Sequence, residues 1–171
     1  IEEVSRDFGV TFPADVSAAK DRRLLALFAS ALHPVDGVAQ ALRDISLMPY
    51  SVASNSPAER VKAALEITGL LPFFSGGITT FEDVLHGKPE PDVFIKAAER
   101  AGLAPARCLV VEDSITGVTA AHRAACPVVG FTGTHPQPAA HAERLKAAGA
   151  SHVVHHMRDL APLVAPLVRA C

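Results

Sequence analysis

The residues best suited to chemistry are two adjacent carboxylates, Glu112 and Asp113, which directly follow the short apolar run 109–111. A run of this kind, rich in β-branched residues, is typical of a strand buried on both faces. Open α/β sheets hold their ligands at the carboxyl ends of the strands, so we expect both acids at that edge. Adjacent carboxylates beside a core need a cation to offset their charge, and Mg²⁺ prefers oxygen ligands. Ser114 or Thr116 can cap a helix that begins near Gly117, and the alternative is that the two acids only form the N-cap and acidic first turn of that helix.

Two other polar stretches also follow segments that read as strands. Ser54 and Asn55 stand just before a helix start, where a hydroxyl and backbone N–H groups suit an anion. Lys88 lies in the loop 87–92, which two prolines stiffen, and its ammonium suits a phosphate. Taken singly, Ser54 could be a helix cap and Lys88 a solvated lysine. The order of the three stretches, each past a strand, favours a joint site for a phosphate and a metal ion.

The elements that would position these residues alternate along most of the chain. Apolar runs bounded by turn residues predict strands at 48–53, weakly within 73–79, and at 108–111, 128–131 and 152–154. Amphipathic spacing predicts helices at about 15–32, 38–45, 57–68, 92–101, 117–124, 138–148 and 159–168. Ser56 and Glu59 predict a capping box, with Pro57 at the first helical position. Alternation of this kind predicts an α/β fold, a parallel sheet with helices on both faces.

Composition narrows the class of protein. The 171 residues are 49% apolar and 20% charged, which fits a globular chain, and the net charge of −2 favours neither nucleic acid nor an anionic membrane surface. No apolar run is long enough to span a bilayer, and no signal peptide opens the chain. The three cysteines and eight histidines lack metal-ligand spacing, so no histidine is assigned to the site. We expect reduced thiols, a cytoplasmic location and a monomer or weak dimer.

The three polar stretches resemble motifs of the haloacid dehalogenase (HAD) superfamily, in particular its phosphatase and phosphomutase branch with a small helical cap. Residues 52–55 resemble the second motif of that family, 87–92 the third and 110–114 the fourth. The resemblance covers nearly the whole chain. It implies a Rossmann-like core domain over 34–171 and the latter part of a helical cap domain over 1–33.

The resemblance also implies an activity: Mg²⁺-dependent hydrolysis of a small phosphorylated metabolite, such as a sugar phosphate. Ser54, with Asn55 after it, would bind the phosphoryl group, and Lys88 would balance its charge, so Ser54 and Lys88 are the expected catalytic residues. Glu112 and Asp113 would anchor Mg²⁺. A phosphomutase shares all of these residues, whereas the dehalogenase branch lacks the metal that the acid pair suits. A catalytically inactive binding module is the alternative from another class.

One departure from the family is serious. The first motif, an Asp-x-Asp pair whose first aspartate attacks phosphorus, has no match among the early aspartates, Asp7, Asp15, Asp21, Asp36 and Asp44. In the family this motif ends the central strand, between the strands that match 48–53 and 108–111. We therefore expect a truncated chain that is inactive alone, its aspartyl-phosphate forming on an aspartate upstream. The substrate is not predicted, and Lys20, Arg22 and Arg23 in the cap could face solvent or substrate.

Overall fold

The computed structural model describes residues 8–11, 16–46 and 48–169. The chain forms two compact units, Ile1–His33 and Pro34–Cys171. In the first unit, helix α2 spans Val16–Ala31, close to the predicted 15–32. Its basic residues Lys20, Arg22 and Arg23 are exposed, and Lys20 Nζ lies 3.7 Å from Asp21 Oδ1.

The second unit contains a three-stranded parallel sheet in the order β3-β4-β5. Its strands are β3 (Val110–Glu112), β4 (Val128–Phe131) and β5 (His152–Val154). The middle strand β4 is buried at all four positions and pairs Val110 with Val128 and Val129 with His152. The predicted α/β fold with parallel strands is therefore confirmed.

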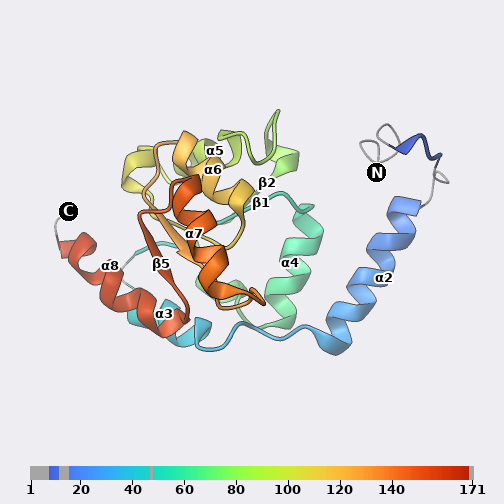
Figure 1. Ribbon diagram of the computed structural model, residues 1–171. Coiled ribbons are helices and arrows are strands. Elements are labelled where there is room, and N and C mark those ends of the chain that lie inside the picture. The colour runs from blue at the N-terminus through green and yellow to red at the C-terminus, as the bar shows by residue number, and fades with distance from the viewer. Residues whose placement is uncertain (1–7, 12–15, 47, 170–171) are drawn as a thin grey trace. The chain divides into compact units, whose positions relative to one another are not determined.

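Helices cover both faces of this sheet, and each face has its own apolar core. On one face β4 contributes Val128 to a cluster with α6 (Ile115–Arg123), α7 (Pro138–Ala148) and α5 (Asp92–Arg100). On the other face Val129 and Phe131 pack with α8 (Leu160–Arg169), and α3 (Val38–Asp44) contacts α8. Figure 1 shows β5 between α7 and α8. The alternation along β4 thus builds two cores around one strand.

A second, two-stranded parallel sheet pairs β1 (Val52–Ser54) with β2 (Ile78–Thr80). Helix α4 (Ala58–Ile67) contacts β2, and α5 contacts both strands. Within the described residues, β1 and β3 belong to different sheets and do not pair with each other. Short 3₁₀ turns complete the unit at Leu71–Phe73, Phe81–Asp83, Pro105–Arg107 and Met157–Asp159.

Two local predictions, on the start of β1 and on the cap of α4, are wrong. The strand predicted at 48–53 begins only at Val52, and Met48 instead packs against the apolar cluster that contains Val129 and Phe131. The capping box is absent because Pro57 occupies the N-cap, which leaves Ser56 outside the helix. Instead the Ala58 N–H donates to the carboxylate of Glu82 at 2.8 Å.

The prediction that β3 is buried on both faces is also wrong. Val111 is 38% exposed, since the apolar cluster on its face includes Leu109 but does not reach Val111. Helix α6 begins at Ile115, two residues earlier than the sequence predicts near Gly117, and Ser114 caps it. No helix in the described part of the chain is both long and apolar enough to cross a membrane.

Candidate active site

The loop that carries Lys88 is fastened to the loop after β1. The Asn55 side chain accepts from the Lys88 N–H at 2.8 Å and donates to the Lys88 carbonyl at 2.9 Å. Gly87 makes this approach possible, because a Cβ there would lie 2.9 Å from Asn55 Oδ1. The far side of the loop is held by Arg123, which donates to Glu90 at 2.8 Å and to the Pro89 carbonyl at 3.2 Å.

The ammonium of Lys88 joins the ends of two strands. It forms an ion pair with the carboxylate of Glu112, at the end of β3, and donates to the carbonyl of Ala53 in β1 at 3.1 Å. It also lies 4.7 Å from the centroid of the Phe94 ring, within cation–π range. The side chains of Lys88 and Glu112 are only 9% and 10% exposed. The alternative of a solvated Lys88 is therefore excluded, and this ammonium is held in one place.

Glu112 is held on its other side by the start of α6. Its Oε2 accepts from the Ser114 hydroxyl at 3.0 Å and from the Ser114 N–H at 3.3 Å. The same hydroxyl caps the helix by accepting from the Gly117 N–H at 2.9 Å. A Cβ at Gly117 would lie 2.1 Å from the Glu112 carboxyl carbon, so the helix approaches the carboxylate as closely as a glycine permits. The positive end of the helix dipole favours a carboxylate at this point.

The remaining predicted site residues, Ser54 and Asp113, stand at the same strand ends without such anchoring. Ser54 Oγ accepts from the Ser56 N–H at 3.0 Å, which leaves its own O–H to donate elsewhere. Asp113 is exposed, and within the described residues no hydrogen bond or ion pair holds its carboxylate. Its backbone carbonyl, in contrast, lies 2.6 Å from Nε2 of the buried His141 in α7.

The positions of Glu112 and Asp113 indicate how far the described residues could bind a metal ion. An unpaired carboxylate on Asp113 beside Glu112 fits the oxygen chemistry of Mg²⁺. The described residues contain no group of three or more His, Cys, Asp or Glu side chains arranged to hold a metal. The two acids therefore supply part of a coordination shell, and Glu112 shares its carboxylate with Lys88.

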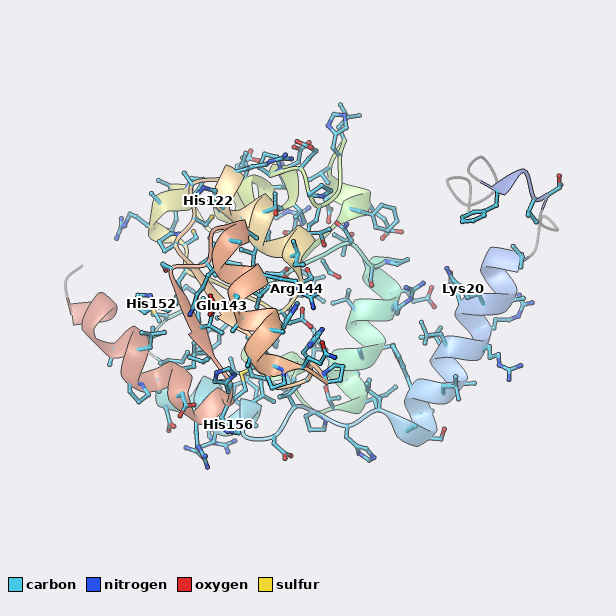
Figure 2. The ribbon with its side chains drawn as sticks, in the orientation of Figure 1. Lys20, His122, Glu143, Arg144, His152 and His156 are labelled. Atoms are coloured by element: carbon cyan, nitrogen blue, oxygen red, sulfur yellow. The ribbon has the colours of Figure 1, made fainter. Side chains whose placement is uncertain are left out.

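Sequence reasoning missed two contributors, Phe94 and His141. Both reach the site through packing between elements distant in the sequence, and neither carries a local signal. His86, the histidine nearest to the loop in sequence, is exposed and pairs with Asp92 at 3.2 Å. Figure 2 labels three further histidines, all exposed: His122 of α6, His152 of β5 and His156.

The comparisons with known proteins identify the family. The family model described as haloacid dehalogenase-like hydrolase matches residues 4–125, which include all three site loops. The chain belongs to the haloacid dehalogenase-like hydrolase family. Its fold resembles a solved haloacid dehalogenase-like protein from Agrobacterium tumefaciens, with a TM-score of 0.79 and 32% identity over 97% of this chain and 75% of that one.

Among curated proteins, two phosphatases of this family are similar in sequence. Validoxylamine A 7'-phosphate phosphatase of Streptomyces hygroscopicus subsp. limoneus is 34% identical over 103 residues, which is 59% of this chain and 48% of that protein. Phosphoglycolate phosphatase of Escherichia coli strain K12 is 39% identical over 88 residues, which is 50% of this chain and 33% of that protein. The chain thus matches half or less of the length of these relatives.

Proposed function

We propose that the complete protein is a Mg²⁺-dependent phosphatase that acts on a small phosphorylated metabolite, such as a sugar phosphate. The single observation that carries this proposal is the fixed ammonium of Lys88 between the ends of β1 and β3. An ammonium held in place among partly buried groups stabilises the negative charge that develops on a transferring phosphoryl group. Similarity to two phosphatases with different substrates supports the phosphoryl chemistry and leaves the substrate open.

Each site residue takes a role that its contacts allow. The Ser54 hydroxyl and the backbone N–H groups after it bind the phosphoryl oxygens, since the Ser54 O–H has no required partner within the loop. The Asn55 side chain is occupied by the backbone of Lys88, so Asn55 positions the lysine rather than contacting phosphate through its amide. Lys88 balances the charge of the phosphoryl group.

Asp113 and Glu112 would hold the Mg²⁺ ion at the same strand ends. When bound, Mg²⁺ supplies positive charge that offsets the phosphoryl oxygens. The Asp113 carboxylate is available for the ion, whereas the Glu112 carboxylate would contact both the ion and the ammonium of Lys88. Two carboxylates are a small share of an octahedral shell, which leaves room for substrate, water and a further protein ligand.

The proposed site still requires a nucleophile, which none of the described site residues supplies. We place it on an aspartate at the end of a strand between β1 and β3, because these strands do not pair with each other within the described chain and Lys88 bridges their ends. Residues 1–33 would then belong to a helical cap that contributes to substrate choice. The free Cys108 and Cys126 are consistent with a reducing cytoplasm.

The experiment that tests this proposal compares the complete protein with its Lys88→Met variant in phosphate release from p-nitrophenyl phosphate and a panel of sugar phosphates, with and without Mg²⁺. We expect Mg²⁺-dependent turnover and a loss of roughly 10²-fold or more in kcat/KM for the variant. Lys96→Met is the matched control, since Lys96 is an exposed helix lysine paired with Glu99. A folded protein with no turnover of any ester would favour the inactive binding module. Transfer of phosphate between hexose positions would favour a phosphomutase.

A further inference from the structure

His141 is a buried polar side chain in contact with the proposed metal-binding segment. It lies in the first turns of α7 and is only 6% exposed. Its Nε2 is 2.6 Å from the backbone carbonyl oxygen of Asp113, which comes from a segment 28 residues earlier in the chain. A carbonyl oxygen only accepts hydrogen bonds, so Nε2 must carry the proton of this pair.

Among the contacts of His141 with the described residues, this hydrogen bond is the one that depends on a polar side chain. Its Nδ1 is buried and has no hydrogen-bond partner among the described residues. Its ring stacks on His135 with 4.0 Å between centroids and 5° between planes, and His135 Nδ1 accepts from the Gln137 N–H at 3.0 Å. The stack fixes the plane of the imidazole, but an apolar ring could also stack. An apolar ring would lack the Nε2 donor, so the hydrogen bond to Asp113 is the contact that needs a polar side chain here.

Glu112 and Asp113 are positioned in different ways. The Glu112 side chain is held directly, by Lys88 and Ser114. The Asp113 side chain has no such partner in the described chain, so its direction depends on its own backbone. Among the described residues, the hydrogen bond that holds the Asp113 carbonyl from outside its loop comes from His141.

We propose that His141 is a positioning residue for the metal site: it holds the Asp113 peptide, and so keeps the Asp113 carboxylate directed for the ion. This proposal rests on the proposed role of Asp113 as a metal ligand. Groups that orient the ligands of a metal typically change its affinity 10- to 100-fold when removed. Because His141 acts on the backbone of the ligand and not on its carboxylate, we expect the lower end of that range.

The test uses two amides that differ in reach. The amide of His141→Gln can place its N–H₂ near the position of Nε2, whereas that of His141→Asn reaches only the position of Nδ1. Mg²⁺ affinity of the complete protein is measured by titration calorimetry, with melting temperature as a check of folding. We expect about a tenfold weaker Kd for His141→Asn and a value within about threefold of the wild type for His141→Gln. Equal affinities in the two variants, whether both normal or both weakened, would overturn the proposal.

Two further variants separate this proposal from the assignment of the metal site. Asp113→Asn should weaken Mg²⁺ binding more than His141→Asn; if it leaves the affinity unchanged, the metal assignment itself fails. His122→Asn is the matched control, because His122 is an exposed histidine on α6 (Figure 2), and it should bind Mg²⁺ normally.

A measurement on the wild-type protein covers the case in which the buried variants do not fold. In ¹H–¹⁵N spectra of the histidine rings, His141 should carry its proton on Nε2. Its signal should shift during a Mg²⁺ titration with the midpoint found by calorimetry, while that of His122 stays constant. A proton on Nδ1, or a His141 signal indifferent to Mg²⁺, would contradict the positioning role.

Discussion

Removal of the Lys88 ammonium should destabilise the fold and also slow the reaction. A solvated lysine, the alternative that the sequence leaves open for Lys88, could be replaced by methionine with little change in melting temperature. In the structure, however, Lys88 and Glu112 are 9% and 10% exposed. Breaking a buried ion pair by deleting one partner costs roughly 3–5 kcal/mol, because the other charge is left uncompensated. The two hydrogen bonds from Ser114 remain on Glu112, so we expect about 3 kcal/mol.

A double-mutant cycle isolates the pair. Lys88→Met, Glu112→Gln and the double variant are compared with the wild type by equilibrium unfolding in urea. Each single variant should lose roughly 3 kcal/mol because one charge is left without its partner, whereas the double variant should lose only about 1 kcal/mol, which is a coupling of about 5 kcal/mol. The exposed pair Lys96 and Glu99, 37% and 66% exposed, is the control, and its coupling should stay below about 0.5 kcal/mol. A coupling for Lys88 and Glu112 as small as that of the control would refute the reasoning.

Three other predictions follow from particular contacts. The Arg100 guanidinium, hydrogen-bonded at 2.6 Å, lowers the pKa of Asp83 from 3.8 to about 2. The pair therefore stabilises the fold above about pH 4 and loses this effect as the pH falls toward 2. Across that window, the unfolding midpoint of Arg100→Met should change less with pH than that of the wild type. Burial raises the pKa of Cys126 to about 11, so mass-spectrometric labelling of the native protein at about pH 8 should leave this thiol unmodified until the protein unfolds. Gly117→Ala should lower the urea midpoint despite a gain in helix propensity of about 1 kcal/mol, because its Cβ would overlap the Glu112 carboxylate; an unchanged or higher midpoint would show that Glu112 can move without loss.

The elements that the sequence predicts best are those whose signals are local. The bounds of β4, β5 and α7 agree with the predicted 128–131, 152–154 and 138–148, because apolar runs there end at proline, glycine or polar residues. The contact that caps α4 was not predictable in this way. Its first N–H is satisfied by Glu82, 24 residues further along the chain, and no pattern around Ser56 reveals that partner.

The same distinction applies to the site. Parallel topology alone predicts that the loops after β1 and β3 meet, and the contacts of Lys88 with Ala53 and Glu112 show how they do. Topology does not predict which side chains fill the space around them. Phe94 and His141 reach the site from α5 and α7, and their contacts depend on how those helices pack against the rest of the core.

Lys88 thus stabilises the fold through the same ammonium that we propose acts on phosphate, and a loss of activity in Lys88→Met is ambiguous by itself. The double variant Lys88→Met/Glu112→Gln leaves no charge buried without a partner, so most of the stability should return. If Lys88 acts only by holding Glu112 and the strand ends together, the stabilised double variant should turn over substrate at least as fast as Glu112→Gln, which also lacks the Glu112 carboxylate. If Lys88 balances phosphoryl charge, turnover by the stabilised double variant should stay roughly 10²-fold below that of Glu112→Gln. Turnover by the double variant close to that of Glu112→Gln alone would therefore assign Lys88 a structural role.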